Sequence, residues 1–266
     1  MKLTMLGTGH AMVTECYNTC LILEEAGEYF LVDGGGGNGI LRQLKRAGIV
    51  PEAIQDLFVT HKHLDHLTGA LWMIRSACQA MDQGRHPGEL RLYSHPEVLE
   101  ILETVASMVL PQSQSRFLGT RVLLIPVSHE EKRQILGRPV LFFDIGSQKA
   151  RQFGFSLDLG EGMRLTHCGD EPCREWEKKY AAGSKWMIHE AFCLASQAGQ
   201  FHPYEKHHST VADACRLAQE LQVQNLILCH TEDTDLPHRR QRYTEEGSRY
   251  YRGNLYVPED LESFLL

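Results

Sequence analysis

Four short apolar runs in this chain each end in a residue type that binds metal ions. Runs of this length predict buried β-strands. In α/β proteins, functional sites form beyond the carboxyl ends of such strands. The pattern therefore predicts an α/β fold that brings four strand ends to one place. The runs are LFVTH ending at His61, LLIPVSH at His129, MRLTHCGD at Asp170 and LILCH at His230.

The first run opens a cluster of three histidines and one aspartate within the six residues HKHLDH. Apolar side chains then recur at helical spacing from residue 67 to residue 78, which predicts a helix. On the loop before this helix, His61 and His63 can point the same way, because alternate residues share a face. Asp65 and His66 can reach a second point nearby. Surface or capping histidines are the alternative interpretation, which the density of the cluster disfavours.

Imidazole and carboxylate together suit zinc or a similar divalent ion, with manganese and iron as alternatives. Two adjacent ions would need a ligand between them, and the two carboxylate oxygens of Asp170 make it the candidate. His129 and His230 would complete the two sets of ligands. A pair of ions would lower the pKa of a water between them, so that hydroxide is available near neutral pH. The cluster therefore indicates a dinuclear metal site with hydrolytic chemistry.

The charge balance limits the class of partner. The formal net charge is -7, which argues against a broadly basic nucleic-acid binder. A basic segment at residues 238–252 contains tyrosines that can stack on bases, although a solvated amphipathic helix is the favoured interpretation.

Location and domain organisation also follow from composition. No window is long and apolar enough to span a bilayer, and the first residues lack the apolar stretch of a signal peptide. We therefore expect a cytoplasmic protein with no membrane partner, whose eight cysteines are reduced thiols. Because no repeat or linker divides the chain, a single domain over residues 1–266 is predicted.

The segment THKHLDH, residues 60–66, resembles the T-H-x-H-x-D-H signature of the metallo-β-lactamase superfamily. Further segments resemble the ribonuclease Z-like branch of that superfamily, whose members process the 3′ end of tRNA. The opening LTMLGTGHA and the strand end FLVDGGGG are similar to motifs of the branch. So are CGDEP, IHEAFC, HHSTVADACRLAQEL and NLILCHTED in the second half of the chain. The resemblance therefore extends along the whole sequence.

The resemblance implies a four-layer αβ/βα sandwich, two mixed sheets flanked by helices, with a dinuclear zinc site between the sheets. It implies that Asp65 handles a proton as well as binding metal, and that Asp33 supports the site. It also implies that Glu190 and His208 protonate the leaving oxygen, for which a buried structural pair is the alternative. The implied ligands are His61, His63 and His129 for one metal, Asp65, His66 and His230 for the other, and Asp170 between them.

Three departures from the ribonuclease Z-like branch bear on the substrate. Leu64 stands where the branch usually has glycine. The branch carries a long arm that binds tRNA, and the residues between Phe155 and Asp170 are too few to form one. Extra residues lie instead at 130–151. These departures put specificity for tRNA in doubt but leave the predicted metal ligands in place.

We therefore predict a metal-dependent hydrolase, a ribonuclease Z-like phosphodiesterase that acts on RNA or a smaller nucleotide-like phosphodiester through hydroxide held between two metal ions. Two alternatives stay open: hydrolysis of a small carboxylic ester, lactone or thioester, and a non-catalytic relative that binds nucleic acid. A redox diiron protein is disfavoured, because a carboxylate rather than His63 would be expected at its second ligand position. A homodimer is an open alternative to a monomer.

Overall fold

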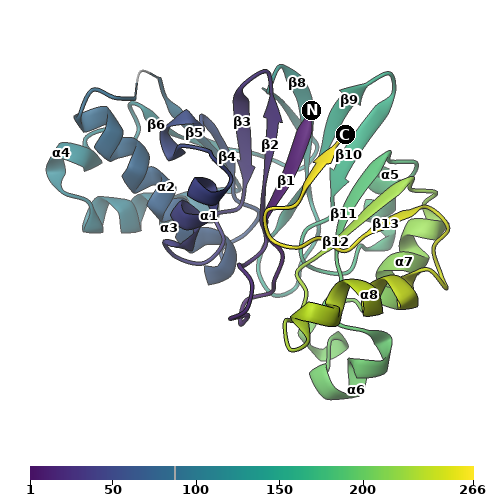
Figure 1. Cartoon of the computed structure of the whole chain (residues 1–266). Coiled ribbons are helices and arrows are strands. Elements are labelled where there is room, and N and C mark those ends of the chain that lie inside the picture. The colour runs from purple at the N-terminus through teal and green to yellow at the C-terminus, as the bar shows by residue number, and fades with distance from the viewer. Residues whose placement is uncertain (87) are drawn as a thin grey trace.

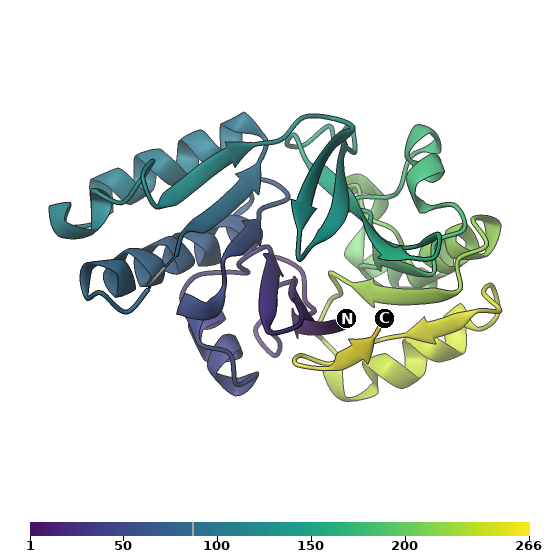
Figure 2. The ribbon, with the colours of Figure 1, turned by 90° about the horizontal axis from the view of Figure 1, so that it is seen from above.

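Two seven-stranded β-sheets lie face to face, and helices cover the outer face of each sheet (Figure 1). The computed structural model describes residues 1–86 and 88–266. Seen from above, the helices of the first half of the chain and those of the second half lie on opposite sides of the paired sheets (Figure 2). This arrangement confirms the predicted αβ/βα sandwich.

The first sheet has the strand order β14-β1-β2-β3-β4-β5-β6. Its pairs are antiparallel from β14 to β3 and parallel from β3 to β6. Because β1 pairs with β14, the two ends of the chain lie side by side (Figure 1). The strands are β1 (Lys2–Gly7), β2 (Cys20–Glu25), β3 (Glu28–Val32), β4 (Asp56–Phe58), β5 (Leu90–Ser94), β6 (Val122–Pro126) and β14 (Ser263–Leu265).

The second sheet has the order β13-β12-β11-β10-β9-β8-β7. Its pairs are parallel from β13 to β10 and antiparallel from β10 to β7. Each sheet is therefore mixed, with a parallel part and an antiparallel part. The strands are β7 (Glu131–Ile135), β8 (Arg138–Asp144), β9 (Phe153–Gly160), β10 (Met163–His167), β11 (Trp186–Glu190), β12 (Asn225–Cys229) and β13 (Asn254–Tyr256).

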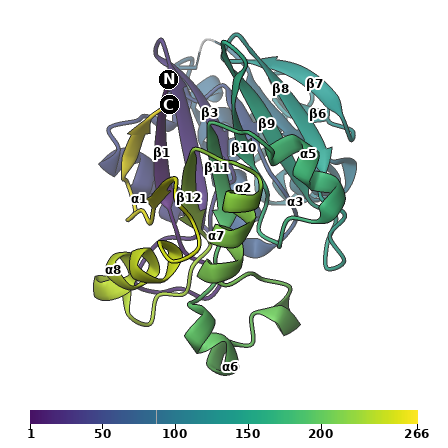
Figure 3. The same ribbon diagram turned by 90° about the vertical axis from the view of Figure 1, so that its right-hand side faces the viewer.

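The outer layers divide between the two sheets. On the side of the first sheet lie α1 (Gly39–Arg46), α2 (Leu64–Asp82), α3 (Pro96–Val109) and α4 (Gln112–Ser115). On the side of the second lie α5 (Lys178–Ala181), α6 (Ala198–Phe201), α7 (Val211–Glu220) and α8 (Leu236–Gly247). Figure 3 shows α7 and α8 in front of the second sheet. Short 3-10 turns occur at Pro51–Ala53, Glu175–Glu177, Ala195–Gln197 and Tyr204–Lys206.

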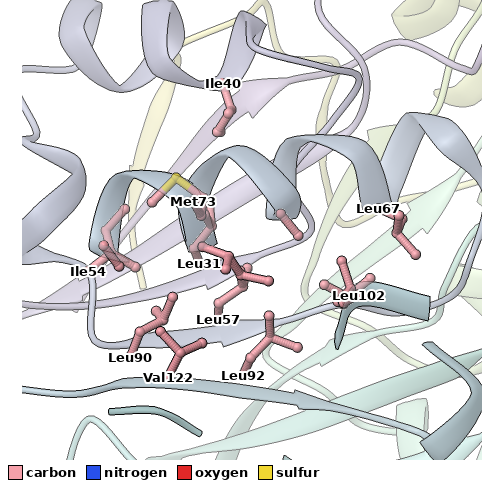
Figure 4. Close-up of a cluster of buried hydrophobic side chains, with 14 of the residues drawn as sticks. Leu31, Ile40, Ile54, Leu57, Leu67, Met73, Leu90, Leu92, Leu102 and Val122 are labelled. Carbon is pink, nitrogen blue, oxygen red and sulfur yellow. The ribbon is translucent and has the colours of Figure 1, made fainter. Parts of the chain in front are cut away.

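The strands of the first sheet bury both faces, because successive side chains point to opposite sides of a sheet. Phe30 and Val32 enter the core between the sheets, whereas Leu31 packs under the helices (Figure 4). The core between the sheets is rich in aromatic rings, and those of Phe30 and Phe155 meet edge to face at 5.8 Å. Each fully buried phenylalanine contributes about 1.5–3 kcal/mol. This shared core holds the two sheets together and fixes where their strand ends meet.

Most predicted elements are present, and two differences are informative. The helix expected from the apolar spacing of residues 67–78 is part of α2. The edge strand β7 was not predicted, because its sequence EKRQI is charged and mostly exposed rather than apolar. The run LLIPVSH does not stay in one strand to its end, because β6 stops at Pro126 and the chain then crosses to the second sheet. Along the part of the chain that the structure describes, no helix is long and apolar enough to cross a membrane.

Candidate metal centre

Six of the seven predicted ligands come together in two groups, and within each group the donor atoms all lie within 4.8 Å of one another. His61 and His63 lie on the loop between β4 and α2, and Asp65 and His66 lie in the first turn of α2. The two remaining ligands follow strand ends of the second sheet. The groups are His61, His63 and Asp170, and Asp65, His66 and His230.

The start of α2 is fixed by contacts with the glycine-rich run that follows β3. Gly34 N donates to His66 O at 2.9 Å, and Gly69 N donates to Gly35 O at 2.9 Å. A Cβ atom added to Gly69 would lie 1.8 Å from Gly34 O, so no larger residue fits there. The run lacks the Lys-Ser/Thr that closes a phosphate loop, and it serves close backbone packing beside the site. It holds the first turn of α2, with its ligands, against the sheet.

Asp33 lies directly behind one of the ligands, as the resemblance implied. Its Oδ2 is 2.8 Å from His66 Nδ1, and Thr60 N donates to its Oδ1 at 2.8 Å. A carboxylate on the far nitrogen of a ligating histidine fixes the ring and its tautomer. His66 Nε2 therefore faces the cluster. Asp33 and His230 both have a left-handed backbone, with φ of 59° and 54°.

The distances between the donor atoms fit a bound metal ion. Asp65 Oδ2 is 3.2 Å from His66 Nε2 and 3.4 Å from His230 Nε2. Asp170 Oδ2 is 3.5 Å from each of these two nitrogens and 3.4 Å from His61 Nε2. Two ligands of a tetrahedral zinc ion lie about 3.4 Å apart, because each is about 2.1 Å from the metal. Asp170 therefore stands where one carboxylate can reach both groups.

One buried atom requires a partner that the described residues do not supply. His66 Nε2 is buried and makes no hydrogen bond within residues 1–86 and 88–266. Burial alone would lower the pKa of His66, but the carboxylates of Asp65 and Asp33 raise it well above its ordinary value. The same surroundings stabilise any added positive charge. The orphaned nitrogen, the donor set and the electrostatics all fit a divalent cation.

The prediction for His129 is corrected by the structure. Its side chain is exposed and lies outside both groups of donors. Asp144 N donates to His129 Nδ1 at 3.1 Å, and Tyr180 Oη is 3.5 Å from Nε2. The physical reason is the course of the chain after β6. That strand is two positions from β4 in the sheet, about 10 Å away, and the residues after it turn toward β7 rather than back toward the cluster.

Glu190 and His208 lie beside the cluster, as predicted, but they are loosely paired. Glu190 is the last residue of β11 and is fully buried. Its Oε2 is 3.5 Å from His208 Nδ1, and neither atom makes a hydrogen bond with another described residue. The His208 ring stacks on Phe192, with centroids 5.1 Å apart, and lies 5.1 Å from the ring of His230. The imidazole is therefore held at the edge of the metal cluster.

A cavity of about 380 Å³ opens over the cluster. Two lysines line it, Lys149 and Lys206, together with the rings of His10 and Phe192. Lys149 Nζ is 3.5 Å from His208 Nε2, and Lys206 Nζ lies over the Phe192 ring at 5.2 Å. The sequence singled out neither lysine, because isolated lysines form no motif. The cavity combines cations, aromatic faces and the cluster.

Gln152 is a second residue that the sequence did not identify. It is buried, and its Nε2 lies 2.8 Å from His61 Nδ1 and donates to Asp170 Oδ1. Its amide therefore holds one member of the first sheet and one of the second in a fixed relation. Gln152 and Lys149 both lie on the segment between β8 and β9, within or beside the extra residues noted at 130–151.

Comparisons with known proteins bear on the family and the fold of the chain. A family model described as Anti-Pycsar protein Apyc1 matches residues 1–249. The ribonuclease Z of Methanothermobacter thermautotrophicus is 28% identical over 86% of this chain and 86% of its own length. The metallo-β-lactamase fold protein YhfI from Bacillus subtilis superposes with a TM-score of 0.81 at 15% identity, covering 99% of this chain and 98% of that one. Human short-form tRNase Z gives 0.74 at 19% identity, covering 100% and 99%. The two structures show that the fold is the metallo-β-lactamase fold.

Proposed function

Because the chain belongs to the Anti-Pycsar protein Apyc1 family, whose model matches nearly all of it, we propose that it is a metal-dependent phosphodiesterase acting on a phosphodiester of nucleotide size. The observation that carries this proposal is the pair of donor groups that share Asp170. Relatives named ribonuclease Z and tRNase Z support the choice of a phosphodiester over a carboxylic ester. The proposed location is the cytoplasm.

Two divalent ions would be held at this site, zinc in the first place and manganese or iron as alternatives. When bound, such ions lower the pKa of bound water and neutralise charge on the phosphoryl oxygens. Asp65, His66 and His230 would hold one ion, His61 and His63 the other, and Asp170 both. Every one of these residues except His63 is buried, so most of the side chains that would hold the ions are shielded from bulk solvent.

Proton transfer to the leaving oxygen falls to His208. Its ring borders the cavity, and Glu190 lies behind it at 3.5 Å from Nδ1. A histidine that a carboxylate orients can be held protonated and deliver that proton. Asp65 Oδ2 lies close to two ligand nitrogens, and the second oxygen of this carboxylate is the proposed acceptor for the proton of the attacking water. The proton donor and the proton acceptor therefore come from different halves of the chain, His208 from the second and Asp65 from the first.

The size of the cavity and the chain around it favour a small substrate. Strands β9 and β10 are joined by only Glu161 and Gly162, so no tRNA-binding arm extends from this hairpin. Lys149 and Lys206 supply positive charge at the cavity in a chain of net charge -7. The rings of Phe192 and His10, with centroids 4.6 Å apart, form an aromatic part of the cavity wall that a base can contact. A phosphodiester of this size is a dinucleotide or a cyclic mononucleotide.

A substrate panel tests the proposal. Metal-loaded protein would be assayed on bis-p-nitrophenyl phosphate, a dinucleotide, a 3′,5′-cyclic mononucleotide, a precursor tRNA, a lactone and a thioester. We expect turnover of the small diesters and poor cleavage of the tRNA at near-physiological salt. Efficient tRNA trimming that persists at that salt would overturn the choice of a small substrate, since tRNA binding depends on many phosphate contacts. Turnover of the lactone or thioester alone would overturn the phosphodiesterase assignment.

A homodimer stays an open alternative to a monomer, and sedimentation velocity over a range of protein concentrations would distinguish the two.

A further inference from the structure

We propose that the two metal positions have unequal affinities, so that one ion binds tightly and the second binds weakly and exchanges. The helix position is formed by Asp65, His66, His230 and the shared Asp170. The loop position is formed by His61, His63 and the same Asp170. This inference rests on the metal centre of the proposed function, but it concerns binding alone and does not depend on the reaction.

The helix position has four donors that already stand at the spacing of a tetrahedral ion. The four separations between its carboxylate oxygens and imidazole nitrogens run from 3.2 to 3.5 Å, against about 3.4 Å for ligands of zinc. All four side chains are buried, and Asp33 fixes the ring of His66 from behind. An ion can enter with little movement of the protein, so little of its binding free energy is spent on rearrangement.

The loop position has one donor fewer and the wrong spacing. His129, the residue expected to complete it, lies elsewhere. His61 Nε2 and His63 Nδ1 are only 2.8 Å apart, so these rings must separate before an ion fits between them. Gln152 holds His61 and Asp170 in place. His63, which is only half-buried, is therefore the side chain that moves. A position with three donors and a cost of rearrangement binds more weakly.

A fixed positive charge acts on the same position. Lys149 lines the cavity with donors of both positions, among them His63, Asp65 and His230. Burial and the charge of Lys149 both lower the pKa of His63, so the ammonium group also repels a cation that binds beside this ring. The helix position has carboxylates on two sides instead, Asp65 within the group and Asp33 behind it. Lys149 therefore weakens the second ion more than the first.

Stepwise metal titration tests the inference directly. Metal-free protein, prepared with a chelator, would be titrated with zinc against a chromophoric competitor, and the bound metal counted by elemental analysis. We expect two steps whose dissociation constants differ by about 10-fold or more. His63→Ala should remove the weak step and keep the tight one, whereas His230→Ala should remove the tight one. Circular dichroism would confirm that both variants are folded.

The charge of Lys149 supplies a test that removes no ligand. Lys149→Gln should strengthen the weak step by about 3- to 10-fold and leave the tight step unchanged. Lys132→Gln makes the same charge change on β7, at a separate cavity, and should alter neither step. Equal affinities within about 3-fold, or loss of the tight step in His63→Ala, would overturn the inference. Two unequal steps in a protein that cleaves no phosphodiester would overturn the proposed function and leave this inference standing.

Discussion

The two halves of the chain build the site in different ways. The first half supplies His61, His63, Asp65 and His66 from one strand–helix junction. The second half supplies its residues from separate strand ends, which only the register of the sheet brings together. Glu190 pairs with Cys229 across β11 and β12, and this places Glu190 beside His230. The first set is a property of local sequence, and the second is a property of the packed sheet.

This difference predicts where a single change does most damage. A substitution in the first half removes one proposed ligand from an otherwise intact junction. Asp170 differs from the first-half residues, because it comes from the second half and its Oδ2 lies within 3.5 Å of nitrogens in both groups. Asp170 therefore contacts donor atoms from both halves of the chain, just as the aromatic core packs the two sheets against each other.

Asp170→Asn should have the largest effect. The amide keeps the shape of the side chain but loses the negative charge that both positions share. We expect the rate on a small diester to fall by about 1000-fold or more, equivalent to about 4 kcal/mol, and metal binding to weaken at both positions. Kinetics and elemental analysis of the same preparation measure the two effects. If only one position lost its metal, Asp170 would belong to that position alone.

His208→Ala tests whether the second half contributes chemistry apart from the metals. We expect the rate to fall by about 100-fold or more on a diester with a poor leaving group, while the metal content is retained. The loss should be much smaller on bis-p-nitrophenyl phosphate, because nitrophenolate leaves without a proton. A similar loss on both substrates would argue for a structural Glu190–His208 pair.

Asp33→Asn probes the support of the first half. Asparagine tolerates a left-handed backbone as aspartate does, so the change removes the charge behind His66 and one of the two oxygens that bond Thr60 and His66. We expect affinity at the helix position to fall by about 10- to 100-fold and affinity at the loop position to change less. Zinc titration measures the affinities of the two positions separately. An equal loss at both positions would mean that Asp33 supports the fold rather than one ligand.

His129→Ala should have the smallest effect. Since the side chain is exposed and contacts Asp144 and Tyr180 rather than the cluster, we expect metal content and rate to stay within about 2-fold of the unchanged protein. The comparison with His230→Ala, which also removes one imidazole after an apolar run, is the control. Loss of one metal from His129→Ala would restore the seven-ligand centre that the resemblance implied.

The sequence could predict residues of the local strand–helix junction more easily than residues that only the packed sheets bring together. The signature at residues 60–66 predicted four of the grouped side chains, because their geometry depends on a single junction. Asp170 and His230 were found because their apolar strands end at them. The same rule gave a wrong prediction for His129, since the run before it leaves the first sheet at Pro126 and the sequence does not mark that point. Gln152 and Lys149 reach the site only through tertiary structure, so no local pattern could reveal them.

The left-handed backbone at Asp33 and His230 gives the site a thermodynamic consequence of its own. Glycine adopts that conformation freely, whereas a residue with a Cβ is destabilised there by about 1 kcal/mol or more. The folded state is therefore less stable at the two strand ends that it needs for metal binding. Replacing His230 with glycine should give a more heat-stable protein than replacing it with alanine, although both lose the same ligand. In the absence of metal, stability favours glycine at these two positions, whereas the proposed metal centre requires aspartate and histidine.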